Sequence, residues 1–253
     1  MKHALKKACK AGIIIVIASG RPYYSLPVSM TSMPEVKYAI VSNGAAIYEI
    51  KTGKRLFSET LEPETVRKAV DAATEMKLTP EFFCNGDAYA EREYIASPEK
   101  YGRSVKFAEY VRTTRKPLYD MHGFIKQNEN NFDSIAYVCP DPVKKKAVME
   151  KLKGIIPEAY ITTSGGDLIE IMHMNATKSN GLKRLCNIIG VHISQAASFG
   201  NGDNDADMLR CAGKGFAMAD GSEMCRNSAD HIIPCCDEDG TAYGIEKILK
   251  GEY

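Results

Sequence analysis

Residues 13–18 form an unbroken apolar run, IIIVIA, that is rich in β-branched side chains. A strand with apolar side chains on both faces is typical of a parallel sheet that helices cover on both sides. Residues 38–42 form a second strand of this kind. The two runs restrict the chain to folds in which a largely parallel sheet lies between layers of helices.

The C-terminal part of the chain repeats this pattern. From residue 179 onward, the helical spacing of Leu182, Leu185 and Ile189 is followed by short apolar runs that alternate with helical stretches. The expected strands are 196–199, 215–219 and 231–233, and the expected helices are 205–212, 222–229 and 243–250. Such strict alternation predicts a parallel α/β sheet.

Residues 61–173 follow a different order. The expected helices are 64–77, 101–112 and 142–152, and the expected strands are 81–84, 88–91, 134–138, 160–163 and 168–172, with a turn at 164–167 between the last two. This order is not a strict alternation of helix and strand. We therefore predict an α+β unit, residues 61–173, inserted between the two parts of one α/β domain, residues 1–60 and 174–253.

The charge balance and the cysteines exclude several classes of protein. The 253 residues carry a formal net charge of +1, which gives no reason to expect a nucleic acid or an anionic membrane as partner. No apolar run is long enough to cross a membrane, and the first residues lack the apolar segment of a signal peptide. The eight cysteines include no Cys-x-x-Cys pair, so we expect buried, reduced thiols in a cytoplasmic protein.

An acidic loop follows one of the predicted strands. Residues 199–208 read FGNGDNDADM and precede a predicted helix. Glycines and short acidic or amide side chains at such a turn supply oxygen ligands for a hard cation such as Mg²⁺. The alternative is a solvated, Asp-rich turn that binds nothing.

Two further segments occupy comparable places in the chain. Ser19 and Gly20 end the first apolar run, where a hydroxyl and a free backbone N–H can hold a phosphate oxygen. The alternative is a strand-ending turn with a capping serine. Lys178 lies just ahead of a helix and can neutralise a phosphate, although most lysines are simply solvated. Because the carboxyl ends of parallel strands converge on one rim, we expect all three segments to meet there.

In their order and spacing, these segments resemble the haloacid dehalogenase superfamily, in particular its Cof-type sugar-phosphate phosphatases. Residues 19–22, SGRP, are similar to the second motif of the family, Lys178 to the third, and residues 200–205 to the fourth. Residues 41–45 and 237–242 resemble two more segments of the Cof group. The resemblance covers essentially the whole chain.

The resemblance implies an α/β fold with a Rossmann-like parallel-sheet core and an inserted α+β cap. It also implies Mg²⁺-dependent hydrolysis of a small phosphorylated metabolite, such as a sugar phosphate. For the oligomeric state we expect a monomer or a homodimer. In such enzymes an aspartate attacks phosphorus to form an aspartyl-phosphate, and a second aspartate two residues later acts as general acid and then base. Ser19, Gly20 and Asn204 would bind the phosphate, and Lys178 would bridge it to the nucleophile as a catalytic residue.

The resemblance further assigns residues to the metal and to the cleft between core and cap. Asn201 would be a metal ligand, Asp205 would support the metal site, and Asn43 and Arg21 would face the cleft. The family usually has an aspartate where this chain has Asn201. Asparagine offers an oxygen without charge, so Mg²⁺ should bind more weakly unless Asp203 compensates.

The first motif of the family is a second departure. It is an apolar strand ending in Asp-x-Asp-Gly-Thr, and it should precede the helix that ends at Gly12, inside which this chain starts. We therefore expect an N-terminally truncated form of a longer product, without the nucleophile, the acid/base and the central strand. Two neighbouring strands should then have unpaired backbone groups and exposed apolar faces. Residues 237–241, DEDGT, fit the missing pattern as a circular permutant would, although Cof proteins normally carry an Asp-Gly loop there.

The cap should select the substrate, and three functions compete. Cap side chains that could reach the cleft, or could instead form cap core and a solvated turn, are Phe82, Phe83, Asn85, Tyr89 and Arg92. The leading hypothesis is the hydrolase. The alternative is a non-catalytic phosphate-ligand binding protein of the same fold, motivated by the missing nucleophile and by Asn201. A phosphotransferase or phosphomutase is the third.

Overall fold

The computed structural model describes residues 1–163 and 167–253. One part is built on a six-stranded sheet with the strand order β7-β6-β5-β8-β10-β9. Neighbouring strands are antiparallel except β6 and β7, which are parallel. The strands are β5 (Thr79–Cys84), β6 (Asp87–Glu91), β7 (Arg115–Leu118), β8 (Phe132–Val138), β9 (Ala159–Thr162) and β10 (Leu168–His173).

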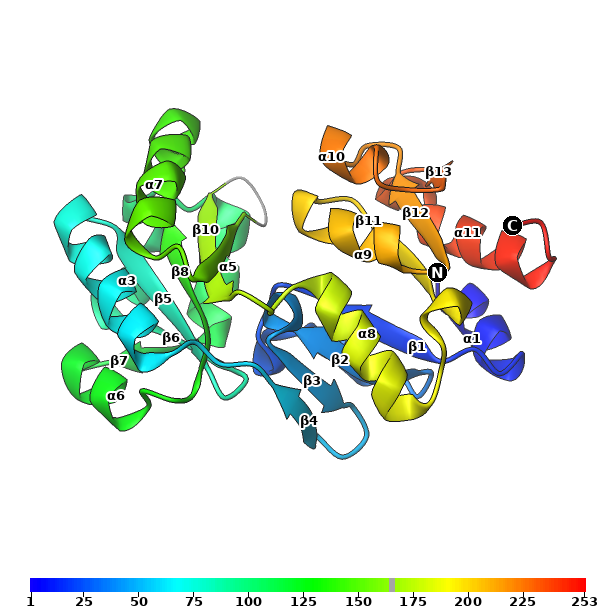
Figure 1. The fold of residues 1–253 in the computed structure, drawn as a ribbon, viewed down its shortest axis with the longest axis horizontal. Helices are drawn as coiled ribbons and strands as arrows, with labels where there is room; N and C mark the ends of the chain where they lie inside the picture. Colours follow the sequence, from blue (N-terminus) through cyan, green and yellow to red (C-terminus); the bar gives the residue numbers. More distant parts are fainter. Residues whose placement is uncertain (164–166) are drawn as a thin grey trace.

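Helices cover the two faces of this sheet unequally. Helices α3 (Pro63–Met76) and α7 (Pro142–Ile155) lie side by side on one face (Figure 1). The helix α6 (Met121–Gln127) adds side chains to the same apolar cluster. On the other face, α4 (Arg92–Ala96) and α5 (Val105–Thr114) pack near β6 and β8. We call this six-stranded unit and its helices the cap.

The remainder of the chain, which we call the core, contains two smaller sheets among the described residues. In the first, β1 (Ile15–Ala18) runs parallel to β2 (Val36–Val41), and β3 (Ala46–Glu49) and β4 (Arg55–Ser58) follow in antiparallel order. In the second, β11 (Ala197–Gly200), β12 (Lys214–Met218) and β13 (His231–Ile233) are parallel. The parallel strands alternate with helices, so the predicted mixed α/β fold with parallel-sheet elements is confirmed.

Helices join the two core sheets. The helix α8 (Lys178–Ile189) packs against α9 (Ala206–Cys211), and α1 (Lys2–Lys10) packs against α11 (Gly240–Leu249). The remaining helices of the core are α2 (Val28–Thr31) and α10 (Glu223–Arg226). Ile15 of β1 and Phe199 of β11 contact the same small apolar cluster between α1 and α11. The two sheets therefore share packing although their strands do not pair with each other in the described part of the chain.

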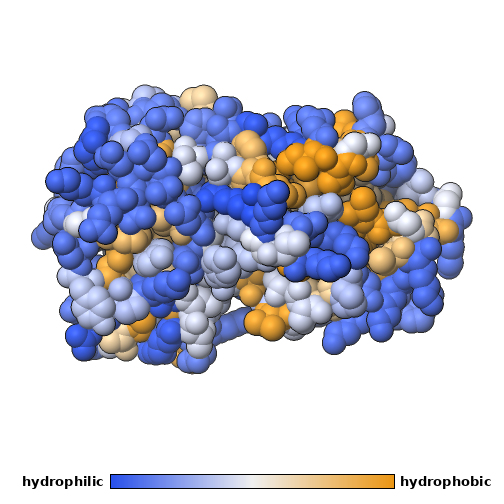
Figure 2. Space-filling view, turned by 90° about the horizontal axis from the view of Figure 1, so that it is seen from below, coloured by the Kyte–Doolittle hydropathy of each residue, from blue (hydrophilic) through white to orange (hydrophobic). Residues whose placement is uncertain are grey.

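The strand β1 corrects one prediction. Within residues 1–163 and 167–253, β1 pairs only with β2, and β11 pairs only with β12, so each has one edge of backbone groups outside a ladder. The apolar run 13–18 is not buried on both faces as predicted, because Ile13 and Ile14 are 37% and 42% exposed. Figure 2 shows apolar surface gathered mainly over the core half of the face in view.

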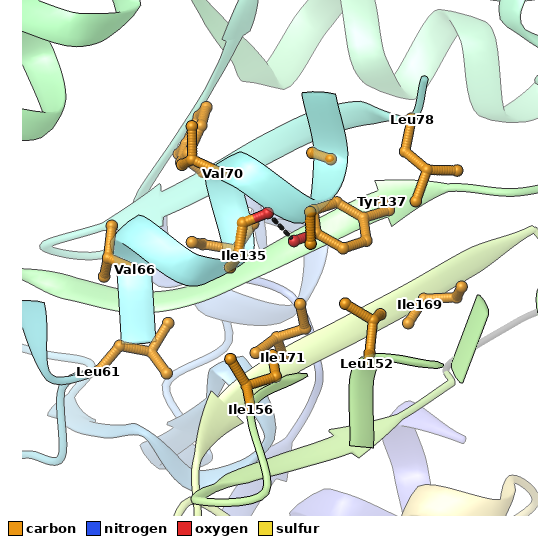
Figure 3. Packing of buried hydrophobic residues seen from close by; sticks show 14 of the residues in the cluster. Leu61, Val66, Val70, Leu78, Ile135, Tyr137, Leu152, Ile156, Ile169 and Ile171 are labelled. Carbon is orange, nitrogen blue, oxygen red and sulfur yellow. Dashed lines mark hydrogen bonds between the residues drawn. The ribbon is translucent and has the colours of Figure 1, made fainter. Parts of the chain in front are cut away.

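An alternation of side chains in the cap decides which residues meet the core. Ile169 and Ile171 of β10 point into the cluster that α3 and α7 cover, together with Ile135 and Tyr137 of β8 (Figure 3). The Tyr137 hydroxyl donates a hydrogen bond to a backbone carbonyl of α3. Since side chains alternate along a strand, Glu170 lies on the opposite face of the sheet, away from α3 and α7.

Most predicted elements are present, and their ends differ in places. The predicted helix 101–112 starts later, at Val105, because Gly102 has a φ of +89° that a helix does not accept. The predicted helix 222–229 is the short α10, Glu223–Arg226. The strand β7 and the helix α6 were not predicted. Part of the predicted turn 164–167 lies outside the described residues. The division at residues 60 and 173 stays a proposal, which the separate pairing of the cap strands supports.

Two broader expectations can be compared with the described residues. No helix in residues 1–163 and 167–253 has the length and apolar character needed to span a bilayer. The eight cysteines are free thiols, but only some are buried as expected, since Cys236 is exposed and others are half-buried. The buried thiols are Cys84, Cys139, Cys186 and Cys225.

Candidate functional site

Ser19 and Gly20 form a turn at the carboxyl end of β1. The backbone N–H of Ser19 donates to the carbonyl of Ile40 at 2.9 Å, and the N–H of Asn43 donates to the carbonyl of Ser19 at 3.1 Å. The Ser19 hydroxyl accepts from the backbone N–H of Arg21 at 3.1 Å. The capping role considered for this serine is therefore observed. It leaves the hydroxyl proton able to donate to a ligand.

Lys178 and Asp205 form a buried ion pair. Lys178 is the first residue of α8, which Thr177 caps by accepting from the backbone N–H of Asn180. The Lys178 ammonium lies 2.5 Å from Asp205 Oδ1, and the two residues are 6% and 5% exposed. Lys178 is therefore not a solvated lysine, which removes the alternative that its sequence position left open. The Lys178 charge is therefore both buried and paired with a carboxylate.

The second oxygen of Asp205 organises the acidic loop. Asp205 Oδ2 accepts hydrogen bonds from the backbone N–H groups of Asn201 and Gly202, both at 3.0 Å. The same carboxylate thus holds the loop after β11 and the ammonium at the start of α8. The loop and Lys178, which are far apart in sequence, meet at one place as predicted from the rim of a parallel sheet.

An amide pair joins this loop to the end of β2. Asn204 Nδ2 donates to Asn43 Oδ1 at 2.9 Å, and both side chains are buried. Asn43 has a left-handed backbone conformation with a φ of +55°. The next residue, Gly44, has a φ of +103°, and a Cβ there would lie 2.1 Å from the carbonyl oxygen of Thr177. Only glycine lets the chain pass this close to the start of α8.

The cap strand β10 also approaches Asn43 and Gly20 of the core. Asn43 Nδ2 lies 3.8 Å from the Met172 sulfur. A Cβ at Gly20 would lie 3.1 Å from Asn43 Oδ1 and 3.2 Å from Glu170 Oε1. Gly20 therefore permits a close approach between the core turn and β10. Sequence reasoning missed Glu170, although an acidic residue between Ile169 and Ile171 in a buried strand was a usable signal.

Arg21 also contacts the cap. Its guanidinium carbon lies 4.5 Å from the centroid of the Tyr110 ring, and that of Arg115 lies 4.6 Å from the same ring. Arg115 Nε donates to the buried carboxylate of Glu81 at 2.9 Å. Burial alone would raise the pKa of Glu81, but the positive charges of Arg115 and Arg103 lower it overall. Asn43 and Arg21 thus both touch cap residues, which is the arrangement expected of side chains at a core–cap boundary.

The other cap side chains considered from the sequence either pack in the cap or make polar contacts away from Lys178. Phe82 and Tyr89 belong to the apolar cluster under α3 and α7, which is the packing alternative. Asn85 accepts a hydrogen bond from Arg55 of β4 at 2.9 Å. The guanidinium of Arg92 stacks on Tyr119 within the cap. None of these contacts joins the cluster around Lys178.

The oxygen donors near the acidic loop determine how well Mg²⁺ would fit. No group of three or more His, Cys, Asp or Glu side chains with metal-binding geometry occurs in the described parts of the chain. Asp205 supplies a carboxylate that already accepts three hydrogen bonds, and Asn201 supplies an amide oxygen from an exposed position. Because Mg²⁺ keeps several waters and needs few protein oxygens beside a phosphate, this donor set fits a weakly held ion.

The DEDGT segment is placed apart from this cluster. Asp237 and Asp239 are exposed, and Asp239 pairs with the N-terminal amino group at 3.3 Å. Lys178 pairs instead with Asp205. The permutant interpretation therefore gains no support from the contacts of these two aspartates.

Comparisons with known proteins identify the family of the chain and agree with its fold. The family described as haloacid dehalogenase-like hydrolase matches residues 1–245, and the chain belongs to this family of hydrolases. It is 26% identical over 268 residues to the 5-amino-6-(5-phospho-D-ribitylamino)uracil phosphatase YwtE of Bacillus subtilis, covering 100% of this chain and 92% of the relative. It is 26% identical over 249 residues to the phosphatase YbjI of Escherichia coli, which has the same activity name, covering 95% and 85%.

Solved structures show the same fold. A haloacid dehalogenase-like hydrolase from Bacteroides thetaiotaomicron has a TM-score of 0.79 at 24% identity, covering 97% of this chain and 90% of the other. A sugar phosphatase of subclass IIB of the superfamily has a TM-score of 0.80 at 18% identity, covering 97% and 89%. At these identities the likeness establishes the fold alone.

Proposed function

We propose that this hydrolase acts on small phosphate monoesters, such as sugar phosphates, with Mg²⁺ as its metal. The observation that carries the proposal is the buried Lys178–Asp205 pair. Asn204, next to Asp205, binds Asn43, whose amide lies against Gly20 of the Ser19–Gly20 turn. A buried ammonium whose carboxylate partner is itself fixed by two backbone N–H groups is a preorganised positive charge. The relatives named above are phosphatases of phosphorylated metabolites by their names.

Each proposed residue has a distinct part. The Lys178 ammonium offsets the negative charge of phosphoryl oxygens, and Asp205 keeps it in place. The Ser19 hydroxyl donates to a phosphoryl oxygen while it accepts from Arg21 N. The Asn43–Asn204 amide pair fixes the position of the loop beside the phosphate.

Asn201 and Asp205 would hold Mg²⁺, which supplies positive charge to a phosphoryl group when it is bound. The superfamily mechanism uses an aspartate nucleophile and an aspartate acid/base. The residues that we place in the site bind and orient the phosphoryl group, and neither of those two aspartates is among them. We therefore propose the aspartyl-phosphate route by resemblance, with its nucleophile outside the residues assigned here.

The test measures phosphate release from a panel of sugar phosphates with Mg²⁺ and with EDTA. Two proteins are assayed: the 253-residue chain, and the same chain with an added N-terminal strand that ends in Asp-x-Asp-Gly-Thr. We expect Mg²⁺-dependent release by the extended chain and a loss of about 100-fold or more in K178M. Lys183, an exposed lysine of the same helix, provides the matched control K183M. An extended chain that folds but releases no phosphate from any ester would refute the proposal.

One observation favours a second function. Asn201 places a neutral amide at a position where the family usually has a carboxylate, so the site can bind a phosphorylated ligand while it binds Mg²⁺ weakly. A non-catalytic phosphate-binding protein of this fold would show ligand-induced thermal stabilisation without turnover. A phosphotransferase would instead transfer phosphate to an acceptor other than water, so the substrate ester would be consumed and a new phosphate ester formed without release of free phosphate.

A further inference from the structure

The turn between β5 and β6 brings the cap into a second contact with the core. Asn85 and Gly86 form this two-residue turn, with φ angles of +51° and +82°. A positive φ at both positions is the type I′ geometry that Asn-Gly sequences favour in hairpins. The Gly86 carbonyl accepts a hydrogen bond from the backbone N–H of Tyr24 in the core at 2.9 Å. The tip of this cap hairpin therefore binds the chain segment that follows the Ser19–Gly20 turn.

Two aromatic side chains of the core lie against the hairpin tip. Tyr48 of β3 is buried, and its ring stacks on that of Tyr23 with the centroids 4.1 Å apart. A Cβ at Gly86 would lie 2.6 Å from the Tyr48 hydroxyl oxygen and 3.3 Å from the Tyr23 Cβ. The turn approaches these two residues so closely because its second residue is glycine.

Arg55 of β4 supplies the polar part of this contact. Its Nη2 forms an ion pair with Oδ1 of Asp133, a buried cap residue on β8, and its Nη1 donates to Asn85 Oδ1 at 2.9 Å. The second oxygen of Asp133 accepts from the backbone N–H of Gly86 at 2.9 Å. One guanidinium of the core thus binds both the hairpin tip and the carboxylate that supports the tip. Arginine can make two such bonds at once because its donors form a planar fork.

The surroundings of Arg55 allow this contact to open. The Arg55 side chain is 21% exposed and Asn85 is exposed, so water at this edge weakens the attraction between the charges. Asp133 keeps the N–H of Gly86 as a partner when Arg55 leaves, because that hydrogen bond lies within the cap. Burial raises the pKa of Asp133 even though Arg55 lowers it. The ion pair therefore does not fully offset the cost of burying the carboxylate.

The position of the cap also determines whether the Ser19–Gly20 turn is covered. Residues 59–62 and 174–177 connect the cap to the core. In the arrangement described, Tyr110 of the cap lies over the Arg21 guanidinium, and the Met172 sulfur lies 3.8 Å from the Asn43 amide. A cap that left the core at the hairpin tip would separate these pairs as well.

We propose that Arg55, Asp133 and the Asn85–Gly86 turn form a latch that fixes the cap on the core. Breaking the Arg55–Asp133 ion pair releases the cap and uncovers the Ser19–Gly20 turn. Latched and released forms are in equilibrium, and the ion pair sets their ratio. The latch contacts involve neither Ser19 nor Lys178, so this inference goes beyond the proposed function and does not depend on it.

The test is backbone amide hydrogen exchange, measured by NMR on the 253-residue chain without any ligand. The Tyr24 N–H reports on the latch because its acceptor belongs to the cap, and the amides of β8 report on the fold of the cap itself. R55M should raise the exchange rate of Tyr24 at least about tenfold, since hydrogen bonds to a charged group carry that difference. The amides of β8 should keep their wild-type rates.

Arg112 provides the matched control, because it forms an ion pair with Glu99 inside the cap. R112M should leave the exchange rate of Tyr24 as in wild type. R55K keeps the charge and loses the planar fork, so it should raise the rate by about threefold or more. It provides the same test if R55M does not fold.

Three results would overturn the inference. The first is a wild-type exchange rate of Tyr24 in folded R55M or R55K. The second is an equal acceleration of Tyr24 and the β8 amides, which would mean that the ion pair stabilises the cap itself. The third is an R112M variant that accelerates Tyr24 as much as R55M does. Each of these results leaves the proposed phosphate site untouched.

Discussion

The Lys178–Asp205 pair allows a quantitative test of how the candidate site is built. Replacing Lys178 by Met removes the cation and leaves a carboxylate that is 5% exposed. Removing one partner of a buried pair costs about 3–5 kcal/mol. Asp205 keeps two backbone N–H donors at 3.0 Å, so we expect the lower end, about 3 kcal/mol. D205N leaves the buried ammonium facing an amide and should cost about 2–3 kcal/mol.

The double variant K178M/D205N contains neither buried charge. It should therefore lose less stability than the sum of the two single changes, with a coupling free energy of about 2 kcal/mol. Urea unfolding at pH 7, followed by far-ultraviolet circular dichroism, gives the free energy of unfolding of wild type, the two single variants and the double variant. K183M, on the exposed side of α8, should stay within about 0.5 kcal/mol of wild type. A coupling below about 0.5 kcal/mol would refute the pair as the element that joins α8 to the acidic loop.

Three further predictions concern the rest of the molecule. Arg115 and Arg103 lower the pKa of Glu81 against the effect of burial, so the stability that Glu81 contributes is present above its unfolded pKa of about 4.3 and is lost as pH falls through the lower folded value. The free energies of unfolding of wild type and E81Q in urea should therefore differ above about pH 5 and converge at lower pH. A difference that does not depend on pH would contradict this. G44A should cost about 2–4 kcal/mol in the same assay because its Cβ meets a carbonyl at 2.1 Å, whereas G12A, with a φ of +82° and open space around it, should cost about 1 kcal/mol. A thiol reagent such as DTNB should label the exposed Cys236 well before the buried thiols. Burial raises the pKa of Cys225 to about 11 and that of Cys84 to about 12, and the thiolate is the reactive form. Early labelling of Cys225 would contradict the packing described.

The parts of the fold that follow from local pattern could be predicted from the sequence. Apolar runs and helical periodicity identified the parallel strands of the core and most of the elements in the cap, because burial on a sheet or helix face imposes those periods. The same rule placed the Ser19 turn, Lys178 and the acidic loop on one rim. The short strand β7, with the sequence RKPL, has no such period and was missed.

What the sequence could not supply depends on contacts between distant segments. The exposure of Ile13 and Ile14 depends on which strands pair with β1. The apolar run alone does not carry that information, whereas the resemblance predicted exposed apolar faces on two strands. The burial of Lys178 depends on Asp205, which lies 27 residues away. Glu170 reaches the candidate site because glycine at position 20 leaves room for it. Each of these facts is set by tertiary packing, which overrides the local preference of a residue.

The central claim is that Lys178 organises a phosphate site at the rim of the core. The most direct measurement is calorimetric titration of inorganic phosphate into the wild-type chain, K178M and K183M. We predict saturable binding by wild type and K183M, and a loss of at least about tenfold in affinity in K178M, which corresponds to about 1.4 kcal/mol. Equal binding by folded K178M and wild type, or no binding by wild type, would contradict the account.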